Sequence, residues 1–208
     1  MSTINIHIVT DGKKDVKQLI HILTAIHTEV ETIQIREKTK TAAELIGLVN
    51  GLVKEGVPKN KLIINDRVDV ALLCEIPTVH LPGHSFAVDQ LKAHFPHLRV
   101  GCSVHTLVEA KKAEDQGADY LIFGHVFQTT SKANLPARGI GQLDKICRST
   151  DIPVIAIGGV SPSTISHLKK VKPHGCAVMS YVLDHQNPLE AVREIKRNIQ
   201  EGYDETSL

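Results

Sequence analysis

Small and polar residues that could bind a phosphate group occur at two places in the last third of the sequence. The pair Gly158-Gly159 follows the β-branched run 154–157, and Met179-Ser180 lies at the end of the next apolar run. Glycine lets backbone N–H groups approach an anion closely, and a helix that follows such a turn adds the positive end of its dipole. We therefore predict a phosphate site formed by Gly158, Gly159, Met179 and Ser180. A simple tight turn at the glycine pair is the alternative.

Charged and amide side chains alternate with apolar ones between residues 33 and 38. Successive side chains of a strand point to opposite faces, so Gln34, Arg36 and Lys38 share one face and Ile33 and Ile35 take the other. Unpaired polar groups are costly to bury. Either a ligand or an internal ion-pair network must therefore satisfy the polar face.

Two further runs end in polar residues, Asn65 and Ser103. Either terminus could merely cap the helix that follows it. The convergence of several polar strand ends on one opening favours a ligand site, because binding sites combine an apolar pocket with a few polar groups.

The segment 124–132 is rich in hydroxyl groups and ends in a lysine. Thr129, Ser131 and Lys132 suit an anion, and His125 lies at the start of the segment. A histidine with an ordinary pKa near ~6.5 can accept or donate a proton near neutral pH. The alternative is a histidine that only bonds a backbone carbonyl.

These residues need a framework that brings strand ends together. Short β-branched runs alternate with longer amphipathic segments to the end of the sequence, which indicates parallel strands joined by helices. The strands are expected at 4–9, 32–36, 62–65, 78–81, 100–103, 120–124, 154–157 and 177–179. The helices are expected at 16–30, 42–55, 68–74, 88–95, 107–116, 142–149, 162–171 and 188–199.

Eight such units predict an α/β fold, a single (β/α)8 TIM barrel over residues 1–208, with its ligand site at the carboxyl ends of the strands. An open doubly wound sheet is the structural alternative, because the pattern alone does not reveal closure.

Composition narrows the functional classes. The net charge is +1 and the basic residues are scattered, so we expect no nucleic-acid partner. The first eleven residues do not resemble a signal peptide and no apolar stretch has the length of a membrane span, so we expect no membrane partner and a cytoplasmic protein. The four cysteines form no C-x-x-C pair.

Several motifs, in order along nearly the whole chain, resemble the thiamine phosphate synthase and TenI superfamily. They are 9–11 (Val-Thr-Asp), 34–38 (Gln-Ile-Arg-Glu-Lys), 65–71 (Asn-Asp-Arg-Val-Asp-Val-Ala), 79–81 (Val-His-Leu), 101–106 (Gly-Cys-Ser-Val-His-Thr), 117–120 (Gly-Ala-Asp-Tyr), 157–159 (Ile-Gly-Gly) and 178–180 (Val-Met-Ser).

Two departures from the synthase pattern favour the TenI branch. Ser85 stands where synthases carry an aspartate that helps to bind Mg²⁺ and pyrophosphate, which leaves Asp66 as the one obvious acidic ligand. One carboxylate is a poor site for magnesium pyrophosphate. Synthases also carry Gly-Pro-Ile where this chain has Gly124-His125-Val126. The resemblance therefore implies an isomerase, a thiazole tautomerase of thiamine biosynthesis that needs no cofactor and no metal.

In that interpretation His125 is the catalytic acid and base that aromatises a carboxylated thiazole phosphate. The superfamily's pyrimidine and pyrophosphate contacts match the predicted substrate-binding residues, some of which would hold the carboxylate here, with Arg36 and Lys132 its natural partners. The matching residues are Gln34, Arg36, Lys38, Asn65, Ser103, Thr129, Ser131 and Lys132.

Two alternatives remain open at this point. One is a Mg²⁺-dependent thiamine phosphate synthase, a transferase, and the other is a barrel that binds thiazole phosphates without turnover. The resemblance also implies a homodimer.

Overall fold

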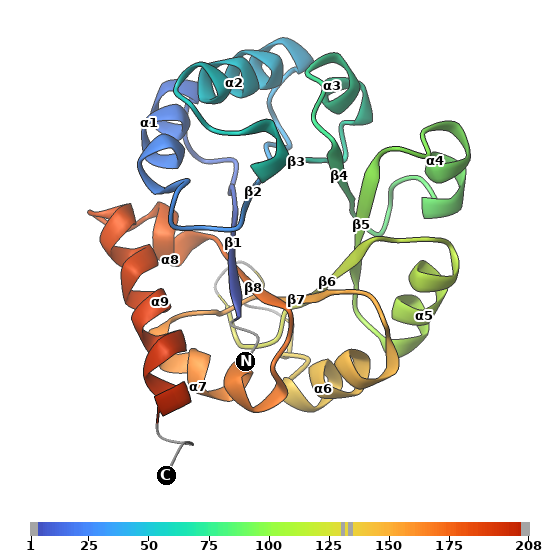
Figure 1. Cartoon of the computed structure of the whole chain (residues 1–208), viewed down its shortest axis with the longest axis vertical. Helices are drawn as coiled ribbons and strands as arrows, with labels where there is room; N and C mark the ends of the chain where they lie inside the picture. The colour runs from blue at the N-terminus through green and yellow to red at the C-terminus, as the bar shows by residue number, and fades with distance from the viewer. Residues whose placement is uncertain (1–3, 130–131, 133–134, 205–208) are drawn as a thin grey trace.

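The computed structural model describes residues 4–129, 132 and 135–204. Eight parallel strands close into a barrel in chain order, and β1 completes the ring by pairing with β8, where Ile6 lies opposite Cys176 (Figure 1). The predicted TIM barrel is confirmed, and the open sheet is excluded by this closure. The strands are β1 (Asn5–Val9), β2 (Thr32–Ile35), β3 (Leu62–Asn65), β4 (Thr78–Leu81), β5 (Arg99–Val104), β6 (Tyr120–Gly124), β7 (Val154–Ile157) and β8 (Gly175–Val178).

The helices form a ring outside the strands (Figure 1). The capping residues fit their positions: Asp15 and Thr41 each form a capping box, and Pro162 is the first residue of its helix after Ser161. The helices are α1 (Val16–Ile26), α2 (Ala42–Lys54), α3 (Val68–Leu73), α4 (Val88–His94), α5 (Leu107–Asp115), α6 (Ile140–Ser149), α7 (Pro162–Val171), α8 (Ser180–Leu183) and α9 (Pro188–Asp204), with a 3-10 turn η1 (Lys59–Lys61).

Several details differ from the sequence prediction. The single turn α8 and the 3-10 turn η1 were not predicted, α1 ends at Ile26 rather than at residue 30, and α9 extends to Asp204 rather than to residue 199. β8 begins at Gly175 rather than at residue 177. Gly175 pairs with Asn5 of β1, and a Cβ atom there would lie 2.5 Å from Nε2 of His7. The glycine therefore belongs to the barrel wall, where the ring of His7 takes the space of a side chain.

The apolar core has two parts. The larger part packs the helices against the outer face of the strands. The buried residues of the smaller part all come from strands, namely β1, β3, β6, β7 and β8, so this part lies inside the barrel. Within the described residues no helix is long and apolar enough to span a membrane.

Candidate active site

One cavity of about 840 Å³ opens at the carboxyl ends of the strands, the end at which TIM barrels bind ligands. The structure gathers there nearly all of the residues that the sequence singled out; Ser131 lies outside the described residues. The predicted residues that line it are Gln34, Arg36, Lys38, Asn65, Ser103, His125, Thr129, Lys132, Gly158, Gly159, Met179 and Ser180.

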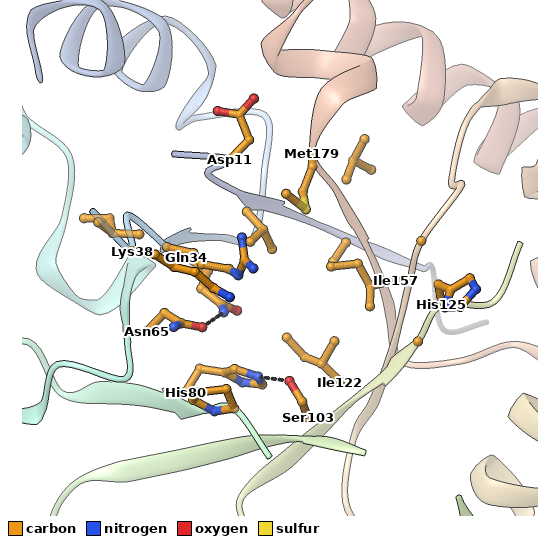
Figure 2. A pocket seen from close by; sticks show the side chains of 18 of the residues that line it. Asp11, Gln34, Lys38, Asn65, His80, Ser103, Ile122, His125, Ile157 and Met179 are labelled. Carbon is orange, nitrogen blue, oxygen red and sulfur yellow. Dashed lines mark hydrogen bonds between the residues drawn. The ribbon is translucent and has the colours of Figure 1, made fainter. Parts of the chain in front are cut away.

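Two amide side chains meet on the β2–β3 side of the cavity. Gln34 is 4% exposed, and its Nε2 donates a hydrogen bond of 2.9 Å to Oδ1 of Asn65 (Figure 2). This bond fixes both amides. It leaves the Gln34 Oε1 as an acceptor and the Asn65 Nδ2 as a donor, and both residues line the cavity.

A histidine and a serine meet on the β4–β5 side. Nε2 of His80 lies 2.9 Å from Oγ of Ser103 (Figure 2). Burial, and after it the Arg36 guanidinium, lowers the pKa of His80 to about 3. The imidazole is therefore neutral and holds the Ser103 hydroxyl in place. Nδ1 of His80 has no hydrogen-bond partner among the described residues.

Three cations line the cavity without an ion pair in the described part of the chain: Arg36, Lys38 and Lys132. The internal ion-pair network considered for Arg36 is therefore absent there. Partial burial, and then the nearby Arg138, Arg36 and Lys38, lowers the pKa of Lys132. The β6–α6 loop thus brings its lysine within electrostatic reach of the end of β2.

The glycine turn after β7 packs so closely against the β6–α6 loop that neither glycine has room for a side chain. Gly158 and Gly159 have φ angles of +99° and +67°, and a Cβ atom would lie 2.4 Å from Cβ of His125 at the first and 2.5 Å from the Gln128 carbonyl oxygen at the second. The backbone hydrogen bonds outside helices and strands in the described residues do not use the N–H groups of Gly159 or Ser180. Those donors can serve an anion.

His125 borders the cavity, but its ring points away from the other labelled side chains (Figure 2). It is 3% exposed, and its Nε2 lies 3.2 Å from the carbonyl oxygen of Leu135. This is the carbonyl contact that the sequence left open as an alternative to proton transfer. The catalytic role of His125 stays a prediction.

His80 and Asp11 also line the cavity, although the sequence prediction did not include them among the ligand-binding residues. His80 lies on a strand whose four positions are all buried, so alternation gave no signal. Asp11 lies two residues after the end of β1, with its side chain 4% exposed and Oδ2 3.6 Å from Nζ of Lys13. Its position near the carboxyl end of a strand is the signal that could have identified it.

Comparison with known proteins identifies the family of the chain that forms this cavity. Residues 6–182 match the model of the TMP-TENI family, described as thiamine monophosphate synthase. The chain belongs to this family. The thiamine-phosphate synthase of Methanococcus maripaludis is 30% identical over 195 residues, which cover 93% of this chain and 94% of the relative. That of Vibrio parahaemolyticus is 33% identical over 199 residues, covering 92% and 96%.

A solved structure agrees with the family assignment. The thiamine phosphate pyrophosphorylase of Pyrococcus furiosus superposes with a TM-score of 0.81 at 30% identity, covering 96% of this chain and 97% of that one. A 3-hexulose-6-phosphate synthase superposes with a TM-score of 0.75 at 14% identity, which is a likeness of fold alone.

These relatives overturn the predicted thiazole tautomerase. Family members that match more than nine-tenths of this chain are named as synthases, which are transferases and not isomerases. The prediction gave two local departures, Ser85 and His125, more weight than the similarity along the whole chain. The placement of the His125 ring removes part of that argument, because the ring is bonded to a backbone carbonyl instead of facing the cavity.

The carboxylates of this family member do not form a built Mg²⁺ site. Among the described residues no group of three or more histidine, cysteine, aspartate or glutamate side chains could hold a metal ion. Nε2 of His84 lies 3.9 Å from Oδ2 of Asp66, and the buried hydroxyl of Ser85 has no hydrogen-bond partner among the described residues. Mg²⁺ is usually bound by one or two carboxylates together with waters and substrate phosphates, so the side chains described here could hold it only together with a bound phosphate group.

Proposed function

We propose that this chain is a transferase of the thiamine-phosphate synthase type. It would join a pyrimidine that carries a pyrophosphate group to a thiazole phosphate. The bond between the pyrimidine methylene carbon and the pyrophosphate oxygen breaks, and its electron pair leaves with the pyrophosphate. The lone pair of the thiazole nitrogen forms the new C–N bond. The products are thiamine phosphate and inorganic pyrophosphate.

The observation that carries this proposal is the division of one cavity into two polar ends. The turns at Gly158–Gly159 and Met179–Ser180 form one end, and the cations that follow β2 form part of the other. Ile122 and Ile157 line the same cavity and add apolar surface to it (Figure 2). Two anionic substrates can therefore lie in one apolar space with their reacting atoms between the ends, which favours reaction by proximity.

The amide pair suits the pyrimidine. An aminopyrimidine edge presents a ring nitrogen that accepts and an amino group that donates. The Asn65 Nδ2 and the Gln34 Oε1 supply the matching donor and acceptor, and their mutual hydrogen bond keeps them in register. Ser103, positioned by His80, supplies a further hydroxyl at the same depth of the barrel.

The direct test is product formation by the full chain from the two substrates, followed as thiamine phosphate and as released pyrophosphate. We expect both products in equal amounts with the phosphorylated thiazole. The matched control is the thiazole alcohol without phosphate, which should react far more slowly because it cannot use the glycine turns. Equal rates with the phosphate and the alcohol would contradict the assignment of the two ends.

Ser85 favours one second candidate, a barrel that binds the same precursors without turnover. By the resemblance to the superfamily, this serine stands where synthases carry an aspartate that helps to bind Mg²⁺ and pyrophosphate. This candidate predicts saturable binding of thiazole phosphate and no thiamine phosphate, with or without added Mg²⁺. Product formation from the two substrates separates the two functions.

A further inference from the structure

Two motifs of the sequence, 101–106 and 117–120, meet inside the barrel. Gly101 of β5 is the register partner of His80 on one side and of Tyr120 on the other. These three positions therefore form one row across β4, β5 and β6. His80 borders the cavity and Tyr120 belongs to the apolar cluster inside the barrel, so both side chains project inward on either side of a residue that has none.

The ring of Tyr120 occupies the space that a side chain at Gly101 would need. A Cβ atom at Gly101 would overlap Cζ of Tyr120. The ring thus reaches across β5 toward β4, where its centroid lies 5.7 Å from that of the His80 imidazole, with the two planes tilted by 35°. Neighbouring strands lie about 4.8 Å apart. Any side chain on β5 at this level would therefore separate the two rings.

The surroundings of Tyr120 hold it in one orientation. The residue is 3% exposed and packs with Val9 and Ile155 inside the barrel. The guanidinium carbon of Arg99 lies 5.9 Å from the ring centroid, within the range of a cation–π contact. Side chains packed in this way occupy defined rotamers. Tyr120 therefore gives His80 a rigid neighbour.

The contacts of Tyr120 lead to the ligand cavity through His80. Among the described residues, His80 and Ser103 line the cavity and Tyr120 does not. The 2.9 Å contact between Nε2 of His80 and Oγ of Ser103 depends on the tilt of the imidazole, because hydrogen bonds weaken steeply with misalignment. Nδ1 of His80 has no hydrogen-bond partner in the described part of the chain. Packing against the Tyr120 ring is therefore what sets the tilt.

We propose that Tyr120 is a positioning residue, which acts on the ligand through His80 and Ser103 without touching it. Gly101 takes part because only a residue without a side chain admits the Tyr120 ring. The inference rests on the proposed function for the identity of the ligand, an aminopyrimidine that carries a pyrophosphate group. The orientation of His80 does not depend on that identity.

Calorimetric titration of the full chain with the aminopyrimidine pyrophosphate, without thiazole, tests the effect on the ligand. We expect Tyr120→Leu to weaken binding by about tenfold, the effect of about one hydrogen bond. Tyr120→Phe, which keeps the ring, should stay within about threefold of the wild type. The matched control is Phe123→Leu, which removes another buried ring from the outer face of the same strand and should leave the Kd unchanged.

Coupling to Ser103 separates a positioning role from a merely structural one. In the Ser103→Ala background, Tyr120→Leu should change the Kd by less than about twofold, because the hydroxyl that it orients is gone. A tenfold loss in both backgrounds, with folding intact by circular dichroism, would overturn the proposal. Tyr120→Met, with a longer and more adaptable side chain, takes the place of Tyr120→Leu if that variant does not fold.

Exchange of the proton between Nε2 of His80 and Oγ of Ser103, followed by nuclear magnetic resonance, gives a readout without ligand. We expect Tyr120→Leu to speed this exchange by about tenfold and Tyr120→Phe to leave it unchanged. Unchanged exchange in Tyr120→Leu would also overturn the proposal. If exchange speeds up but the wild type does not bind the aminopyrimidine, the positioning of His80 stands and the proposed function loses its pyrimidine substrate.

Discussion

The polar side chains of the cavity fall into two groups with different work to do. Gln34, Asn65, His80 and Ser103 are bonded in pairs at 2.9 Å, so their orientations are fixed before a ligand arrives. Arg36, Lys38 and Lys132 have no ion pair within the described part of the chain, so their charges are available to an anionic ligand. The fixed neutral groups can orient a bound heterocycle, whereas the unpaired charges attract its anionic group. A site for a polar heterocycle that carries an anionic group needs both.

The pairing of His80 with Ser103 predicts a coupling between the two positions. We expect His80→Leu and Ser103→Ala each to lower kcat/KM for thiamine phosphate formation by about tenfold, the effect of about one hydrogen bond. The double variant should lose little more, because Ser103 is useful only when His80 orients it. His80→Gln, which keeps an N–H donor, should recover much of the loss.

A double-mutant cycle measures this coupling, with the free energy of unfolding of each variant as the stability control. Losses that simply add in the double variant would mean that the histidine does not act through the serine.

At this scale the sequence predicted which strand ends meet, because alternation and polar termini mark the mouth of a barrel. It did not predict the direction of the His125 ring, since that depends on the Leu135 carbonyl ten residues away. It also could not reveal that the carboxylate of Glu37 is engaged by Lys40 while Arg36 stays unpaired. Such pairing is decided by loops whose paths the pattern does not encode.

The loops after β6 and β7 support each other. The N–H of Val126 donates to the Ile157 carbonyl at 2.9 Å, and that of Phe127 donates to the Gly158 carbonyl at 3.0 Å. The loop that carries Lys132 is therefore tied to the turn that offers the phosphate donors. These backbone hydrogen bonds connect the β6–α6 loop to the glycine turn after β7.

The close packing of the glycine turn predicts that two glycine substitutions will have opposite effects on the free energy of unfolding. Gly159→Ala should destabilise the protein by more than about 1 kcal/mol, because φ is +67° and a Cβ would lie 2.5 Å from the Gln128 oxygen. Gly47→Ala is the control: it lies in α2 with no atom within 4 Å of its Cβ position, and alanine should stabilise the helix by up to about 1 kcal/mol.

Chemical denaturation of the two variants gives both free energies of unfolding, and titration with thiazole phosphate gives the affinity. Gly159→Ala should also bind the phosphate more weakly. If Gly159→Ala has the stability of the wild type and the same affinity for thiazole phosphate, the turn tolerates a side chain.

The sequence predicted the number, order and approximate bounds of the principal elements, because eight strand patterns alternate with eight helical ones. It missed α8 because a single turn, Ser180–Leu183, is too short to produce a helical period. It shortened β8 because a glycine at its start resembles a turn, while its actual role is to admit the ring of His7.

The count of eight strands led us to expect a closed barrel. The sequence pattern does not reveal whether the first and last strands pair, and the structure shows that β1 pairs with β8. Closure also encloses two histidines. Burial, followed by the charges of His174 and Arg99, lowers the pKa of His7 to about 3, and His80 is lowered to about 3 as well. The predicted homodimer and cytoplasmic location remain predictions.

These two histidines predict acid sensitivity of the whole fold. In the unfolded chain each takes up a proton near the ordinary value of 6.5, whereas in the folded chain each stays neutral down to about 3. The unfolded state therefore binds more protons in this window, and stability falls as the pH falls. The slope should approach about 1.4 kcal/mol per pH unit for each histidine.

Denaturation midpoints between about pH 7 and pH 5 isolate the histidines from most carboxylates. We expect His80→Gln to reduce the slope by about half, since one of two such groups is removed. His97→Gln, on an exposed residue, should keep the slope of the wild type. A flat profile in the wild type would show that the buried rings do accept protons in the folded state.

The central claim is that one cavity holds two anionic ligands at opposite ends, and simultaneous binding tests it most directly. Thiazole phosphate is titrated into the full chain, first alone and then with inorganic pyrophosphate at saturation. The account predicts a ternary complex, with a thiazole phosphate Kd that changes by less than about threefold. Competition, in which pyrophosphate displaces thiazole phosphate, would mean that both anions use one end and would contradict the account.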